Sequence, residues 1–255
     1  MEYVAVLRAR RTLTWFIGII FALVAIGLAL SFKDGPPHVQ MSHGAHPAIP
    51  FGWIVGGASF APLIITAFLA AGLDAEYRTT AIAWTRPMSR LAIAWRYVAI
   101  DVGAMVVAWA ATATVAIIAI VALGLGQYFA YGPEGYSFFV LPFGCALMWY
   151  GLIVLVSAMF PGRGNAVAGS SWAYALIVPG FSQIPFPPLI HQVMVGLNYI
   201  NPLAYMGSTN FGARVHTSGG VLAGSTTDHT IAAWLIGLAA LAIGTRIWAS
   251  REVSA

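Results

Sequence analysis

Three histidines and a methionine lie close together between prolines in the first quarter of the chain: His38, Met41, His43 and His46. Imidazole and thioether ligands suit copper, and imidazole also suits zinc, so these side chains are candidates for binding one metal ion. Loops tolerate histidine freely, however, and no acidic or cysteine residue lies among them. We therefore favour no metal site here, and a metal-handling protein stays the alternative function.

The residue patterns of an enzyme active site are missing. A phosphate-binding loop of the G-x-x-x-x-G-K-[ST] type needs a lysine, and the only lysine, Lys33, lies in the sequence FKD. The patterns H-E-x-x-H and G-x-S-x-G do not occur either. Ser170 and Ser171 lie in an apolar stretch, where small residues indicate close helix packing, and we expect Cys145 to be a buried apolar side chain. We predict a chain that is not an enzyme, and we expect any ATP that drives it to bind another subunit.

The composition indicates a membrane protein. Of the 255 residues, 60% are hydrophobic and only 8% are charged, whereas soluble domains carry about 25% charged residues. Most of the chain must therefore have lipid as its solvent. The formal net charge of +4 does not indicate a nucleic-acid partner, because the twelve basic residues are scattered between apolar runs and form no basic face.

Six segments are apolar enough to cross a membrane, which takes roughly 20 residues. They are residues 15–32, 51–73, 92–125, 137–160, 166–181 and 231–248. The third is overlong and the fifth is short, which tilt or extension beyond the bilayer accommodates. We predict an all-α integral membrane protein with six transmembrane helices in a single domain covering residues 1–255.

The basic residues predict the orientation. With a cytoplasmic N-terminus, ten of the twelve lie on the cytoplasmic side, and only Lys33 and Arg214 lie outside. The ten are Arg8, Arg10, Arg11, Arg78, Arg86, Arg90, Arg96, Arg163, Arg246 and Arg251. Because Lys and Arg accumulate on cytoplasmic loops, both termini are predicted to be cytoplasmic.

Two further patterns lie outside the predicted spans, one before the first span and one before the last. Val4 and Leu7, together with Arg8 and Arg11, predict a short amphipathic N-terminal helix in the headgroup layer, with a basic flank of the first span as the alternative. Before the last span, the short apolar pieces 189–200 and 203–211 lie on either side of an Asn-Pro break. Such pieces predict re-entrant or interfacial helices.

Segment 74–90 concentrates charge between the second and third spans. Asp74 is placed to cap a helix, Glu76 lies near the positive end of its dipole, and Pro87 ends it. These features predict a short polar helix parallel to the membrane, with Trp84 available to pack on a partner. The alternative is a connecting loop whose arginines only anchor the topology.

The segment resembles the cytoplasmic signature of small six-helix permease subunits of ABC exporters, of the type-two class. That signature often runs E-x-R-x-G-T, then apolar residues, then P-x-S-R. Its places are held by Glu76, Arg78, Thr79, Thr80, Pro87, Ser89 and Arg90. The Ala83-Trp84-Thr85 run is similar to the actinobacterial branch, and Asn201-Pro202 stands where the family often has an N-P pair. The glycine before the threonine is absent, and Arg96 stands where a lysine is common.

The resemblance implies an ATP-driven exporter in the plasma membrane. Two permeases would pair as a homodimer, and two separate ABC ATPase subunits would bind ATP and Mg²⁺, with no cofactor in this chain. Segment 74–90 would be the coupling helix that docks on the ATPase, through Asp74, Glu76, Tyr77, Arg78, Thr79, Thr80, Trp84, Arg86, Pro87, Ser89 and Arg90. The exported compound is expected to be amphipathic or lipophilic, and its binding residues are not identified.

Asp101 is an ionisable residue near the inner end of the third predicted span. Such residues in apolar segments are functional candidates by default. We favour a structural interpretation, in which Asp101 forms an ion pair with Arg96 or with another interfacial arginine.

Overall fold

In the computed structural model, the described residues are 2–32, 48–75, 89–124, 126, 133–181, 184, 186–207, 222 and 224–251. Within these ranges all regular structure is helical, which confirms the all-α prediction for this part of the chain. The long helices are α1 (Glu2–Phe32), α2 (Ala48–Ala70), α5 (Arg90–Ala122), α6 (Pro133–Met159), α7 (Gly164–Phe181) and α10 (Thr226–Ser250). The short ones are α3 (Gly72–Ala75), α8 (Pro188–Asn198) and α9 (Pro202–Gly207).

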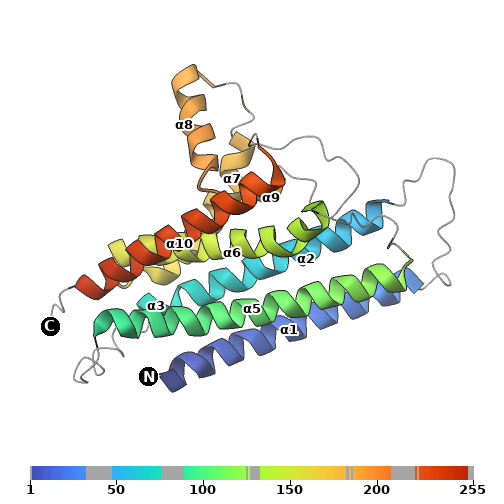
Figure 1. Ribbon diagram of the computed structural model, residues 1–255, viewed down its shortest axis with the longest axis horizontal. Coiled ribbons are helices and arrows are strands. Elements are labelled where there is room, and N and C mark those ends of the chain that lie inside the picture. Colours follow the sequence, from blue (N-terminus) through green and yellow to red (C-terminus); the bar gives the residue numbers. More distant parts are fainter. Residues whose placement is uncertain are drawn as a thin grey trace.

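The helices α1, α2, α5, α6 and α10 run along a common axis (Figure 1). The start of α1 and the end of α10 lie at the same end of this bundle, which we call the terminal end. α3, the start of α5 and the turn between α6 and α7 lie there too. The terminal end therefore gathers segments from across the whole sequence.

Among the described residues, three helices are long and apolar enough to cross a membrane: α5, the Phe139–Met159 part of α6, and α10. α5 has 33 residues, which at 1.5 Å per residue makes it about 50 Å long. Val121 on α5 and Leu235 on α10 are among the large aliphatic side chains that stand exposed on these helices. Exposed aliphatic side chains on long apolar helices suit lipid, consistent with a location in a membrane.

α6 is the central helix of the bundle. Every residue from 141 to 150 is buried, and α6 contacts α2, α7, α9 and α10. A helix that is apolar and buried all round is the expected core of a helical membrane protein. The positions of the surrounding helices are therefore set largely by the surface of α6.

α6 and α10 approach each other closely through glycines. A Cβ on Gly237 would lie 2.8 Å from the backbone nitrogen of Met148, and one on Gly244 would lie 2.9 Å from Leu155 Cα. From the α6 side, a Cβ on Gly151 would lie 2.6 Å from the carbonyl oxygen of Gly237. Small residues let helix backbones pack closely where the hydrophobic effect cannot drive association. α10 packs more extensively on α6 than on any other described element.

The N-terminal helix differs from its prediction. The sequence predicts a separate amphipathic helix, whereas α1 runs without a break from Glu2 to Phe32. Ala5 and Ala9 are buried, and Arg8 forms an ion pair with Asp101 of α5. Because these contacts draw the first turns into the bundle, the basic start continues the first long helix, as in the alternative interpretation.

Two short helices, α8 and α9, lie one on each side of Asn201 in the broken apolar region, and their re-entrant or interfacial placement stays a prediction. α8 projects from the side of the bundle (Figure 1), and Leu189 is 74% exposed. Hydrogen bonds join α7 to α8 and to Asn201, which directly precedes α9. The Tyr174 hydroxyl donates to the carbonyl oxygen of Leu197 at 2.5 Å, and the buried Asn201 amide donates to that of Ala175 at 3.1 Å.

Candidate functional site

The predicted coupling segment is described only at its two ends. Asp74 lies in α3, Ser89 precedes α5, and Arg90 is the first residue of α5. The other predicted coupling residues lie outside the described residues: Glu76, Tyr77, Arg78, Thr79, Thr80, Trp84, Arg86 and Pro87. The candidate metal ligands His38, Met41, His43 and His46 also lie outside them.

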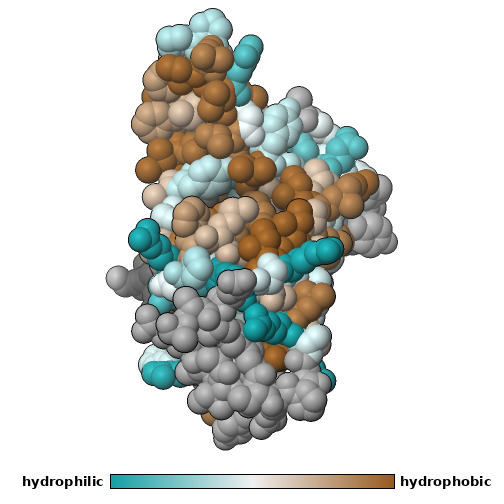
Figure 2. Space-filling model, turned by 90° about the vertical axis from the view of Figure 1, so that its left-hand side faces the viewer, coloured by the Kyte–Doolittle hydropathy of each residue, from teal (hydrophilic) through white to brown (hydrophobic). Residues whose placement is uncertain are grey.

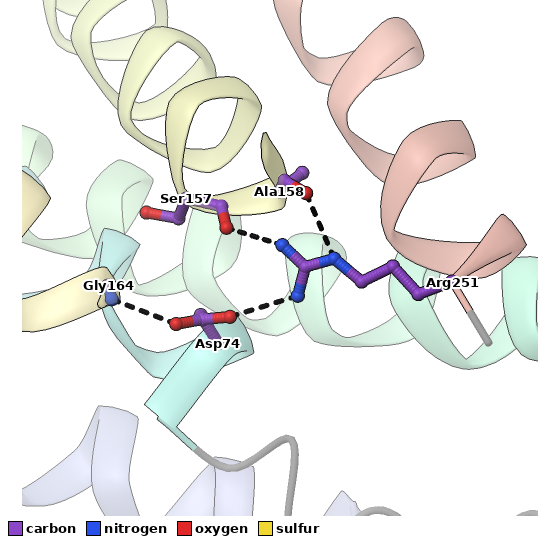
Figure 3. Close-up of polar contacts among 5 residues, drawn as sticks. All are labelled: Asp74, Ser157, Ala158, Gly164 and Arg251. Atoms are coloured by element: carbon purple, nitrogen blue, oxygen red, sulfur yellow. Dashed lines mark hydrogen bonds and ion pairs between the residues drawn. The ribbon is translucent and has the colours of Figure 1, made fainter. Parts of the chain in front are cut away.

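Asp74 is 3% exposed, and each of its carboxylate oxygens accepts a hydrogen bond (Figure 3). Oδ2 accepts from the backbone nitrogen of Gly164, the first residue of α7, at 2.8 Å, and Oδ1 accepts from Arg251 Nη1 at 3.0 Å. A carboxylate suits the positive end of a helix dipole. The sequence predicts that Asp74 caps a helix of its own segment, whose following residues lie outside the described ones; the bonds that are described place the Asp74 carboxylate at the start of α7. The reason is close packing, since a Cβ on Gly164 would lie 2.9 Å from Asp74 Cβ.

Arg251, which follows the last residue of α10, joins three segments through one guanidinium group (Figure 3). Nη1 donates to Asp74, Nε donates to the carbonyl oxygen of Ala158 at 2.9 Å, and Nη2 donates to that of Ser157. Ser157 and Ala158 belong to the last turn of α6, whose carbonyls lack partners within the helix. A cation at that position also complements the helix dipole.

The other end of segment 74–90 reaches the same residue. Arg90 Nη1 donates to the carbonyl oxygen of Arg251 at 2.7 Å. Just before it, the Ser89 hydroxyl accepts from the backbone nitrogen of Ala92 at 3.2 Å and caps the start of α5. Both ends of the segment therefore meet at Arg251, one at its side chain and one at its backbone.

A second, partly buried ion pair joins α1 to α5 near this end. Arg8 Nη2 donates to Asp101 Oδ1 at 2.7 Å, and the Tyr150 hydroxyl donates to Asp101 Oδ2 at 2.8 Å. The ion pair expected for Asp101 is present, with Arg8 as this partner. Gly72 of α3 packs on the same guanidinium, since a Cβ there would lie 1.3 Å from Arg8 Nη1.

The two ion pairs fix the positions of helices relative to one another. Burying a charge is costly, and an ion pair compensates for this only when the geometry is good and further hydrogen bonds satisfy the remaining lone pairs. Asp74 and Asp101 each accept two such bonds. Within the described ranges, no group of three or more His, Cys, Asp or Glu side chains could hold a metal ion. Each ion pair connects helices that are distant in sequence.

A groove with a cavity volume of about 260 Å³ lies between α6, α7 and the start of α9. Its lining is apolar apart from a few hydroxyls: Trp149, Leu152, Ile153, Val156, Val167, Ser170, Ser171, Tyr174, Ile200 and Pro202. Trp149 Nε1 donates to the Ser171 hydroxyl at 2.9 Å, and its ring packs edge-on against Trp172 at 4.5 Å between centroids. A mainly apolar groove with few polar groups suits an alkyl chain or an aromatic ring.

The sequence does not predict which residues bond to Asp74 and Asp101 at the terminal end. Arg251 is used there only to orient the chain, and neither Gly164 nor Arg8 is assigned a role in a site. The only local signals are an arginine directly after the last apolar helix and a glycine after a short arginine turn. Both residues contact Asp74 from positions 90 or more residues away in sequence.

Comparison with models of known protein families gives no match, and comparison with curated proteins and with solved structures gives no significant match. We therefore infer function from the sequence pattern and from the geometry at the terminal end of the bundle.

Proposed function

We propose that this chain is the membrane-spanning permease subunit of an ATP-driven exporter of the ABC type. It crosses the plasma membrane six times with both termini in the cytoplasm, and α8 and α9 lie at the outer interface. It acts as a homodimer with two separate ABC ATPase subunits, which bind ATP and Mg²⁺ and hydrolyse ATP. The chain itself is not an enzyme and holds no cofactor.

One observation carries the proposal: both ends of segment 74–90 are anchored together at the terminal end. A coupling helix must pass movement of an ATPase to several membrane helices. Asp74 is bonded to the start of α7 and to Arg251, and Arg251 is bonded to the end of α6. Movement of the segment would therefore reach α6, α7 and α10 directly. An ordinary loop, which only connects α2 to α5, needs no such anchoring.

The distribution of basic residues supports a cytoplasmic terminal end. Arg8, Arg90 and Arg251 take part in its ion pairs and hydrogen bonds, and Arg163 directly precedes the α7 residue that Asp74 contacts. Figure 2 looks onto this end, where hydrophilic residues gather around the middle and hydrophobic residues cover the upper part. Basic residues concentrated at one side of a helical array favour the cytoplasm for that side.

The groove between α6 and α7 supports an amphipathic or lipophilic cargo. Its walls are apolar, and the hydroxyls of Ser170 and Ser171 are its main polar groups. A compound with an apolar body could enter such a groove from the lipid phase without losing hydration. A strongly charged cargo would find no compensating charge among the lining residues.

A pull-down of the tagged chain from its native membrane in mild detergent, followed by mass spectrometry, tests the proposal. We expect an ATPase with a phosphate-binding loop at equal stoichiometry. Glu76→Ala and Arg86→Ala should weaken its capture, whereas Arg246→Ala, a control at an exposed α10 position, should not. Recovery of the chain alone, under conditions that preserve such complexes, would sink the proposal and turn attention to metal binding by His38, Met41, His43 and His46.

A further inference from the structure

We infer that Arg251 is a positioning residue that fixes both ends of segment 74–90 relative to each other and ties them to the α6–α10 pair. This inference rests on the proposed function, in which that segment receives movement from the ATPase. The Arg251 guanidinium holds Asp74 at the first end, and its carbonyl oxygen accepts from Arg90 at the second. Arg251 therefore bonds to both ends of the segment.

The chemistry of the contact requires an arginine. Three different nitrogens of the Arg251 guanidinium donate to three acceptors on two separate elements: a carboxylate oxygen on α3 and two carbonyl oxygens on α6. The planar, forked guanidinium presents donors in fixed directions, whereas a lysine ammonium acts as a compact point charge on a flexible stem. Lysine at position 251 could keep the ion pair with Asp74 and would lose the simultaneous bonds to Ser157 and Ala158.

The contacts of Arg251 and Asp74 join the segment to helices that do not adjoin it in the sequence. Segment 74–90 is covalently continuous with α3 and α5 only. Through Arg251 it is also joined to α10 and to the last turn of α6, which are themselves packed tightly through Gly151, Gly237 and Gly244. Through Asp74 it is joined to the start of α7. Displacement of the segment therefore moves α6, α7 and α10 together, and these helices include the walls of the groove.

The first test uses the chain alone and needs no ATPase. Spin labels at Leu91→Cys and Pro161→Cys, both exposed positions beside the network, report the distance between the start of α5 and the α6–α7 turn. The native Cys145 is buried and should stay unlabelled. In lipid nanodiscs, Arg251→Gln should broaden and lengthen this distance distribution, Arg251→Lys should give an intermediate one, and the matched control Arg246→Gln should leave it unchanged. An Arg251→Gln distribution identical to the parent would overturn the inference.

The second test uses the complex with the copurified ATPase. In the parent complex, ATP should shift the Leu91–Pro161 label distance. In the Arg251→Gln complex, we expect ATPase affinity to fall by about tenfold, with hydrolysis retained at saturating ATPase but no ATP-dependent shift. A variant that is merely misfolded would instead fail to bind the ATPase at any ATPase concentration. An Arg251→Gln complex that keeps the full shift would overturn the inference. A parent chain that captures no ATPase would instead overturn the proposed function, and the first test would still decide the role of Arg251.

Discussion

Arg251 and Asp74 are 177 residues apart in sequence, yet Arg251 Nη1 lies 3.0 Å from Asp74 Oδ1. Their side chains are only 9% and 2% exposed. In such a pair, much of the free energy lies in the penalty that either charge would carry if it were left buried without the other. Removing one partner and removing both should therefore have different consequences for stability.

Asp74→Ala is expected to lower the free energy of unfolding by about 3 kcal/mol. The Arg251 guanidinium would stay next to the α6 carbonyls without its countercharge, and the Gly164 amide would lose its acceptor. Arg251→Ala should have a similar effect, and the double variant should cost less than the sum of the two because the residues interact directly. Thermal unfolding in detergent measures all three, with Arg246→Ala as the control. Strictly additive effects would mean that the two side chains do not interact.

Gly72→Ala should displace Arg8 from Asp101. The new Cβ would lie 1.3 Å from Arg8 Nη1 and 1.9 Å from Cζ, so the guanidinium must move. Because Asp101 would then lose its charged hydrogen bond from Arg8, we expect a loss of about 2 kcal/mol in the free energy of unfolding. Gly103→Ala is the matched control, since a Cβ there meets nothing within 4 Å.

Removal of the arginine distinguishes this mechanism from a general intolerance of Gly72. In an Arg8→Ala background, the added methyl group has no guanidinium to displace, so Gly72→Ala should then cost little. A cost that persists in that background would show that the Arg8 contact is not the reason for the glycine.

The helices could be predicted from the sequence because their signals are local. A described helix overlaps each of the six apolar segments that the sequence marks, and Ser89 caps the start of α5. An apolar run and a capping side chain each act on residues that are neighbours in the chain, so both signals can be recognised in a single sequence. The break at Asn201, which separates α8 from α9, is local in the same sense.

The partners within the site could not be predicted, because tertiary packing selects them. An ion pair for Asp101 follows from the cost of burying a charge in an apolar helix, but several arginines satisfy that requirement. The structure selects Arg8, 93 residues away, because α1 packs along α5. In the same way, Asp74 has the chemistry of a helix cap, and the packing of the α6–α7 turn on α3 determines that it caps α7. The coupling residues from Glu76 to Pro87 stay a prediction.

Tyr150→Phe is expected to lower the free energy of unfolding by about 2 kcal/mol, because Asp101 would lose a buried hydrogen bond to a charged oxygen. The ring keeps its shape, so the packing of α6 should not change and the variant should fold. Tyr199→Phe, at a residue that is 52% exposed, serves as the control in thermal unfolding. Equal stability of Tyr150→Phe and the parent would show that the 2.8 Å contact with Asp101 contributes little.

The close approach of α6 and α10 gives the last prediction. Gly237→Ala and Gly244→Ala would each place a methyl group within 3 Å of the α6 backbone, which cannot rotate aside as a long side chain can. The helices must then separate, and we expect each variant to lower the free energy of unfolding by about 1–3 kcal/mol. Gly169→Ala on α7, where a Cβ meets nothing within 4 Å, should be neutral or slightly stabilising, because alanine favours a helix more than glycine does. Thermal unfolding of the three variants in one detergent separates these effects. If Gly237→Ala were as stable as Gly169→Ala, the two helices would not be as tightly coupled as the role of Arg251 requires.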